Sequence, residues 1–242
     1  MRLAIGEWGL PERVQVDRDP VFCDPKGKSP FPSRLHLWLL ALGIDLVFGR
    51  AYRPQDQGLT ERSHQLWATQ CLVGQQFDDW QDLFLALHQR RDFLNYQLPC
   101  ASLDDQPPLV AFPQAAHSGR DYRPEWETDL LDLERLWPFL AQGRWFRQTG
   151  ANASFSLAKQ RYSVGMPHAH MQLEITFDPL DQDLLCHDPT GALLRRLPIK
   201  GLSKATLMGE LAPYAALPCF QLHLPLTWQD FRVLRLFETI GS

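Results

Sequence analysis

The sequence predicts an α/β region followed by a small β-barrel-like domain. Strand and helix patterns alternate between residues 13 and 96, as in an α/β fold. Residues 99–125 then carry five prolines and little periodicity, which indicates a linker or an extended arm. From residue 144 onward, short β-prone segments are separated by turn signals, a pattern typical of a small barrel.

The α/β region begins with a short alternating, β-branched segment at 13–17 that ends in a carboxylate, Asp17. Pro32 and Ser33 open an apolar helix over 35–42, and Gly43 ends it. The apolar run 44–48 favours a buried strand. Together these patterns predict strand, helix, strand.

Two further helices are predicted, over 60–73 and from 78 or 79 to 96. The second has apolar residues at the spacing of one helix face: Trp80, Leu83, Phe84 and Leu87. A helix is also expected over 128–140. Strands are expected over 144–149, 154–157, 161–164, 172–177, 184–188 and 193–197. The tail is expected to hold a strand at 220–224 and a helix from Thr227.

These patterns divide the chain into an α/β part at 1–98, a linker at 99–125, a helix with the β-rich domain at 126–200, and an extension at 201–242. No apolar run is long enough to span a membrane, and the first ten residues do not resemble a signal peptide. Five scattered cysteines without a C-x-x-C pair suggest reduced thiols in a cytoplasmic protein.

The formal net charge of −4 argues mildly against a protein that binds DNA alone. Basic residues nevertheless gather in the second half of the chain. Residues 142–173 contain Arg144, Arg147, Lys159 and Arg161 with no acidic residue, and a second basic run holds Arg195, Arg196, Lys200 and Lys204. Both runs fit either a solvated surface or a contact with the DNA backbone.

Two carboxylates occupy positions from which they could converge on a metal ion. Asp17 ends the first strand, and Glu61 lies in the first turn of a helix. Carboxylate oxygens suit Mg²⁺, and paired ions can activate a nucleophile in phosphoryl transfer. By itself this placement is weak evidence for a metal site, because Asp and Glu at the ends of helices and strands are usually structural or solvated.

A sequence resemblance strengthens this interpretation. The segment Trp8-Gly9-Leu10-Pro11, with Val14-Gln15-Val16-Asp17, resembles the strand that carries the second catalytic Asp in DDE-type integrases and transposases. The segment Tyr52-Arg53-Pro54, continuing through Gln57-Gly58 to Glu61-Arg62-Ser63-His64, resembles the family's Y-x-P-x-x-N-G-x-x-E-R-x-H segment. Asn95-Tyr96, Pro99 and the prolines that follow resemble the end of such cores.

The resemblance implies a retroviral-integrase-like, RNase H-like core in which Asp17 and Glu61 are catalytic metal ligands for Mg²⁺ or Mn²⁺. In that family a metal-activated water or 3′-hydroxyl attacks a DNA phosphodiester in DNA integration and recombination. DNA would be the substrate, and the residues expected to contact it are Arg62, His64, Arg144, Arg147, Lys159 and Arg161. His64 could equally be a surface or packing histidine.

The chain also departs from the family pattern. Gln57-Gly58 replaces Asn-Gly, Asp19 is a rival ligand, and residues 26–32 resemble an insertion. Only sixteen residues precede Asp17, too few for the strand that carries the first catalytic Asp. We therefore expect a truncated core, inactive alone, with weak or absent metal binding, whose partners are DNA and either further copies or a full-length transposase. The alternative is a non-catalytic DNA-binding or transposase-assembly module.

Overall fold

The computed structural model describes residues 1–16, 29–49 and 58–209. By internal contacts the chain divides into two units. Unit 1 comprises Met1–Ala51 with Gly119–Gly209, and unit 2 comprises Tyr52–Ser118 with Glu210–Ser242. The two clusters of buried apolar side chains share no residue, one belonging to each unit. The boundaries predicted at residues 98, 125 and 200 remain a prediction.

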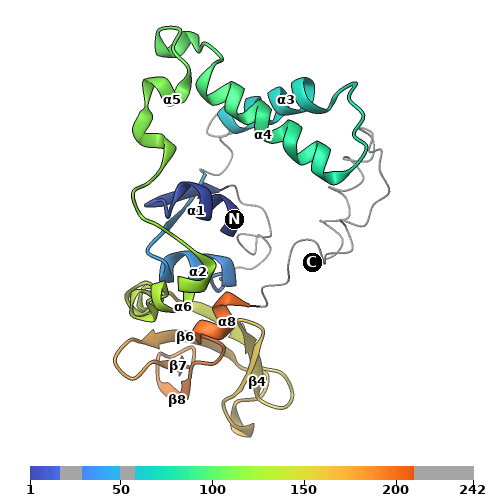
Figure 1. Cartoon of the computed structure of the whole chain (residues 1–242). Helices are drawn as coiled ribbons and strands as arrows, with labels where there is room; N and C mark the ends of the chain where they lie inside the picture. The colour runs from blue at the N-terminus through green and yellow to red at the C-terminus, as the bar shows by residue number, and fades with distance from the viewer. Residues whose placement is uncertain (17–28, 50–57, 210–242) are drawn as a thin grey trace. The chain divides into compact units, whose positions relative to one another are not determined.

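The first part of unit 1 is a small α/β arrangement. Strands β1 (Arg13–Val16) and β2 (Asp45–Phe48) pair in parallel, and helix α2 (Arg34–Ala41) lies between them in the chain (Figure 1). The hydroxyl of Ser33 accepts the backbone N–H of His36 at 3.2 Å, which caps α2. The predicted strand, helix and strand are confirmed for the described residues.

The expectation that residues 44–48 form a buried strand is only partly right. Ile44 is fully buried, but along β2 half-buried and exposed residues alternate, and Val47 is 43% exposed. On the exposed face Arg13 pairs with Asp45 at 3.6 Å. Within the described residues this sheet has two strands and one covered face, so alternate side chains reach solvent.

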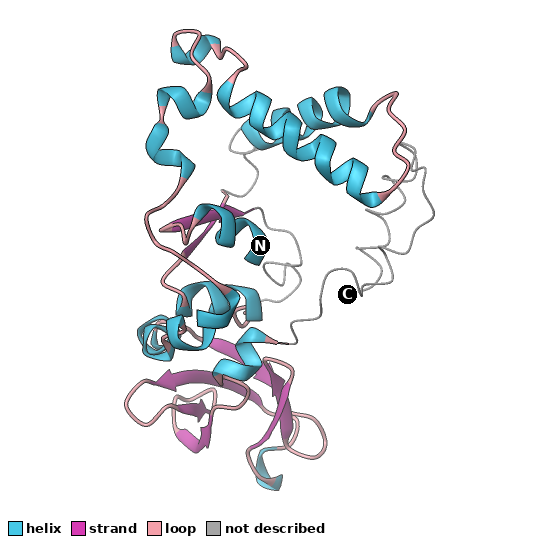
Figure 2. Ribbon diagram, viewed as in Figure 1, coloured by secondary structure: helices cyan, strands magenta, loops and turns pink. Residues whose placement is uncertain are grey.

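The β-rich part of unit 1 contains a four-stranded antiparallel sheet. Its order is β3 (Trp145–Gln148), β6 (Gln172–Asp178), β7 (Asp183–His187) and β8 (Leu193–Pro198). Strands β4 (Ser154–Leu157) and β5 (Gln160–Ser163) form a separate hairpin (Figure 2). All six predicted strands are therefore present.

The predicted barrel is not observed among the described strands. β3 and β8 are the two edges of the four-stranded sheet, and the hairpin does not pair with either. Ser29 instead binds the backbone of β3: Phe146 N–H donates to the Ser29 hydroxyl at 3.0 Å, and that hydroxyl donates to the Arg144 carbonyl at 2.9 Å. A segment from before α2 thus satisfies backbone groups at this edge.

The single helix expected over 128–140 is also wrong, because the segment is broken into α6 (Glu127–Leu130), the 3₁₀ turn η6 (Leu133–Arg135) and α7 (Leu136–Ala141). The break has a local cause. Leu131 is extended, and Asp132 donates its backbone N–H to the Ala41 carbonyl at 2.9 Å, outside any helix. The Asp132 carboxylate then accepts the Glu134 N–H at 3.0 Å and starts the next turn.

A buried carboxylate ties the elements of unit 1 together. Glu127 is fully buried and accepts Arg2 Nε and Nη2 at 2.7 and 2.8 Å, Trp38 Nε1 at 2.5 Å and the Tyr122 hydroxyl at 2.7 Å. Arg2 Nη2 also donates to the Met208 carbonyl at 2.7 Å. Helix α1 (Arg2–Trp8) and the end of α8 (Lys204–Met208) therefore meet at one ion pair.

Burial alone would raise the pKa of Glu127, but hydrogen bonds from Arg2, Tyr122 and Trp38 hold that pKa below its ordinary value. The same contact raises the pKa of Arg2, and burial together with the bond to Glu127 raises the pKa of Tyr122. Glu127 and Arg2 therefore stay charged and Tyr122 stays protonated near neutral pH. Trp38, the third donor to Glu127, is itself buried.

Unit 2 is helical in its described part. It contains α3 (Gly58–Trp67), the π-helical turn η2 (Ala68–Leu72) and α4 (Trp80–Tyr96), so both predicted helices are confirmed. The Asp79 carboxylate accepts the Asp82 N–H at 2.7 Å and caps α4. Of the apolar face predicted for α4, only Leu83 is fully buried, while Trp80 and Phe84 are 45% and 47% exposed.

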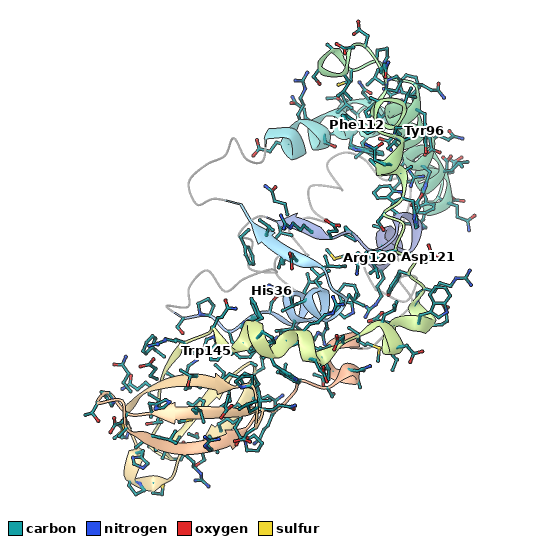
Figure 3. All side chains as sticks on the ribbon, turned by 90° about the vertical axis from the view of Figure 1, so that its left-hand side faces the viewer. His36, Tyr96, Phe112, Arg120, Asp121 and Trp145 are labelled. Carbon is teal, nitrogen blue, oxygen red and sulfur yellow. The ribbon has the colours of Figure 1, made fainter. Side chains whose placement is uncertain are left out.

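The proline-rich segment predicted as a linker holds short helical turns. These are η3 (Ala101–Leu103), α5 (Pro108–Ala111), η4 (Pro113–Ala116) and, within unit 1, η5 (Pro124–Trp126). Helix α5 packs against α4, and Figure 3 shows Phe112 and Tyr96 on this part of unit 2. No helix in the described ranges has the length and apolar character needed to cross a membrane.

Candidate nucleic-acid interface

The two residues predicted as catalytic metal ligands are only partly described. Asp17 and its rival Asp19 lie outside the described residues, as do the strand and helix predicted in the tail. Strand β1 is followed as far as Val16, whose carbonyl accepts the Gly49 N–H at 2.9 Å. Glu61 is exposed in the first turn of α3. The predicted pairing of Asp17 with Glu61 therefore remains a prediction.

Among the described residues, no group of three or more His, Cys, Asp and Glu side chains is placed to hold a metal ion. Glu61 by itself offers one carboxylate, whereas proteins hold Mg²⁺ through one or two carboxylates together with water and substrate phosphate. His168 and His170 lie in and after the turn η7 (Met166–His168).

Several basic residues of the four-stranded sheet are neutralised by carboxylates. Arg144 pairs with Glu174 at 3.0 Å. Arg196 pairs with Asp178 at 3.2 Å and Asp181 at 2.6 Å. These exposed pairs leave little net positive charge on this part of the sheet. Arg144 is exposed apart from this ion pair, and its predicted contact with DNA remains a prediction.

The β4–β5 hairpin separates an apolar face from a polar one. Phe155 lies opposite Tyr162, and their rings stack at 5.4 Å in the core. Paired residues point to the same side, so Ser154 with Ser163 and Ser156 with Arg161 form the opposite face. Hydroxyl and guanidinium groups on that face are typical ligands of phosphate oxygens.

Three basic residues belong to this hairpin or contact its backbone, and we call Lys159, Arg161 and Lys200 the hairpin basic cluster. Arg161 Nε donates to the Ser154 hydroxyl at 3.0 Å. Lys200 Nζ donates to the Arg161 carbonyl at 3.2 Å and lies 5.2 Å from the centre of the Tyr162 ring. Within the described ranges the partners of Arg161 and Lys200 are neutral oxygens and a ring, so their charges are not cancelled by carboxylates.

Lys159 occupies the turn of the hairpin. Ala158 and Lys159 are the two residues between β4 and β5, and both have positive φ, 52° and 60°. Such values correspond to the type I′ turn that suits a two-residue hairpin, where Asn and Gly are the usual residues. The turn therefore holds an exposed ammonium group at the tip of the hairpin.

The remaining predicted DNA ligands have different surroundings. Arg147 donates to three backbone carbonyls, those of Ser156, Ser29 and Phe146, at 3.2, 2.9 and 2.8 Å. It holds β3 against the hairpin and the segment before α2. Arg62 is exposed on α3 in unit 2, and the side chain of His64 lies outside the described part of the chain.

Sequence reasoning placed Lys200 in a basic run but did not link it to the hairpin. The link depends on Tyr162, whose hydroxyl accepts the Lys200 backbone N–H at 2.8 Å. Burial raises the pKa of Tyr162, so the hydroxyl is present as a neutral group. No spacing rule connects residues this far apart in the chain.

A search against models of known protein families finds no match.

Proposed function

We propose that this chain is the C-terminal portion of a DDE-type DNA strand-transfer enzyme and that its β-rich part holds the DNA backbone. The observation that carries the proposal is the hairpin basic cluster. Lys159 and Arg161 lie in a run of the chain, 142–173, that has no acidic residue, and Lys200 joins them through its bond to the Arg161 carbonyl. Electrostatic contacts of this kind provide most of the sequence-independent affinity for DNA. The motif resemblance around Asp17 and Glu61 supports the link to strand transfer.

In this proposal residues 1–98 are a truncated RNase H-like core, and Asp17 and Glu61 are the second and third catalytic acids. A bound Mg²⁺ or Mn²⁺ would supply Lewis-acid activation of a water or 3′-hydroxyl. We propose that the first acid is supplied by another segment or chain and that cutting of DNA requires it. The protein acts in an oligomer or with a full-length transposase.

A non-catalytic DNA-binding or transposase-assembly module is the second candidate. It rests on the hairpin basic cluster alone and does not require the motif resemblance around Asp17 and Glu61. In this case the hairpin basic cluster contacts DNA and Asp17 and Glu61 have no catalytic role. The two candidates share DNA binding and differ in whether metal-dependent strand transfer depends on the two carboxylates.

DNA binding is tested by fluorescence anisotropy of a labelled duplex over a range of salt concentrations. The double variant Lys159→Gln/Arg161→Gln is expected to bind more weakly and to lower the salt slope by about 2, roughly one for each lost phosphate contact. Arg196→Gln is the matched control, because Arg196 lies on strand β8 of the same unit and its charge is already paired with a carboxylate. Unchanged binding by the double variant would exclude this face as the DNA contact.

The catalytic part is tested on the coding DNA upstream of Met1. A reading frame, in phase or shifted, that supplies a strand ending in Asp is expected, and co-expression of its product should restore metal-dependent strand transfer. That activity should then disappear in Asp17→Ala and in Glu61→Ala. Activity that survives both changes would contradict the catalytic proposal, as would an upstream region without such a strand. Either result would favour the second candidate, the non-catalytic DNA-binding module.

A further inference from the structure

Unit 2 contains a cleft between the π-helical turn η2, the segment after it, and α4. Its volume is about 330 Å³, and its lining includes one arginine, Arg90, with three glutamines and two phenylalanines, Gln70, Gln75, Gln89, Phe77 and Phe93. The lining residues include a cation and no carboxylate. The volume falls at the lower end of the range of small-ligand sites. The site therefore suits a small ligand that carries negative charge.

Arg90 has an incomplete set of hydrogen bonds. Its Nη2 donates to the Gln70 carboxamide oxygen, and its guanidinium carbon lies 4.4 Å from the centre of the Phe93 ring. Its Nε is buried and has no hydrogen-bond partner within the described ranges. A buried donor without an acceptor is costly, so an oxygen supplied by a ligand would be favoured there.

Arg2, in the same chain, shows which group the Nε and Nη2 atoms of an arginine can bind together. Arg2 uses Nε and Nη2 together to hold both oxygens of the Glu127 carboxylate, at 2.7 and 2.8 Å. Of the corresponding two nitrogens of Arg90, Nη2 donates to the amide oxygen of the exposed Gln70 side chain, and Nε has no partner within the described ranges. Gln70 lies in a π-helical turn, a feature often found at functional sites. If Gln70 turns aside, both nitrogens face an oxyanion.

We propose that this cleft binds a nucleotide, with its phosphate on Arg90 Nε and Nη2 in place of Gln70. Arginine binds phosphate through two parallel hydrogen bonds of this kind. One phosphate does not require the full cleft. The remaining lining offers the amides of Gln75 and Gln89 for the polar edge of a base and apolar atoms of Phe77 and Phe93 for its body. The nucleotide comes either from solution or from a single strand.

The proposal is tested by calorimetric titration of the full chain with thymidine and adenosine 5′-monophosphate, a short single-stranded oligothymidylate, and inorganic phosphate. Saturable binding of a mononucleotide, tighter than that of phosphate, is expected for a free nucleotide. Binding of the oligonucleotide alone identifies a strand as the source. Absence of binding by both overturns the proposal.

A substitution at Arg90 and a control at the next residue test whether the binding depends on this arginine. Arg90→Lys retains the charge but loses the two-nitrogen geometry, and is expected to weaken binding about tenfold or more. Arg91→Lys changes the neighbouring arginine, which pairs with Asp92 and does not line the cleft, and is expected to bind as the unchanged protein does.

Gln70→Glu places a carboxylate beside Arg90, as Glu127 lies beside Arg2. It is expected to abolish nucleotide binding while the melting temperature stays the same or rises, which separates loss of the site from loss of the fold. Nucleotide binding that is unchanged in both Arg90→Lys and Gln70→Glu contradicts the proposal. This inference is independent of the proposed function, since Lys159→Gln/Arg161→Gln should leave mononucleotide binding intact.

Discussion

At the scale of single residues, Glu127 contributes most visibly to the stability of unit 1. Glu127→Gln removes the charge that Arg2 faces while keeping nearly the same volume, and the half-buried Arg2 guanidinium loses its anionic partner. Breaking a buried ion pair from one side destabilises by several kcal/mol, so we expect a loss of about 3 kcal/mol in urea unfolding. Glu134→Gln, an exposed carboxylate in the same segment, is the control. Equal effects of the two changes would contradict this role.

His36 makes the stability of unit 1 depend on pH. It lies on α2 (Figure 3), with its ring 4.9 Å from that of Phe139 and 5.8 Å from that of Phe48, and burial lowers its pKa. The unfolded chain therefore takes up a proton more readily, and stability should fall as the pH drops below about 6.5 toward the lowered pKa. Urea midpoints between neutral and mildly acidic pH measure this dependence.

Two variants test whether His36 causes this pH dependence of stability. His36→Phe keeps a ring between its neighbours without a titrating group, so the pH dependence in this window should shrink. His170→Gln, which changes an exposed histidine, should retain it. A pH profile that is the same in His36→Phe and the unchanged protein would assign the dependence to other groups.

At the scale of elements, the end of α2 depends on a glycine. Gly43 has a φ of 71°, and a methyl group there would meet the Arg135 guanidinium. Arg135 can move, but the left-handed backbone remains strained for alanine, so Gly43→Ala should destabilise unit 1 by about 1–2 kcal/mol. Gly6→Ala is the matched change, since nothing lies within 4 Å of its added carbon inside α1. It should be neutral or stabilising. Thermal unfolding of both variants decides.

The elements that the sequence predicted correctly are those whose signals are local. Ser33 and Gly43 bracket α2, Asp79 caps α4, and alternation marks the strands of the β-rich part. The helix expected over 128–140 failed because Asp132 bonds to Ala41, a residue from a different part of the chain. The barrel failed because closure depends on whether distant strands pair, which alternation within one strand does not determine.

The candidate sites show the same limit. Lys159 and Arg161 stood out by their position in a run without acidic residues, and they lie together on the hairpin. Arg144 belonged to the same run, yet it pairs with Glu174 across the strands β3 and β6. The cleft at Arg90 had no sequence signal, because its character comes from a donor that lacks an acceptor in three dimensions.

At the scale of the whole molecule, the two units have separate apolar clusters. We therefore expect Glu127→Gln to speed amide hydrogen exchange in α2 and the four-stranded sheet while exchange in α4 stays unchanged. Exchange measured by mass spectrometry on the full chain resolves these segments. A parallel increase in α4 would show that the chain opens as one cooperative body.

The bond from Arg2 to the Met208 carbonyl also bears on how the protein is made. Unit 1 is assembled from the first and the later parts of the chain, with the helices of unit 2 encoded between them. During translation α1 and α2 emerge long before their partners Glu127 and α8 exist, whereas α3 and α4 meet as neighbours. Folding that joins distant segments is slow, because the loop must close before the long-range contacts form. We therefore expect the apolar side of α2 to stay uncovered in the nascent chain until the partner segments of unit 1 have been made.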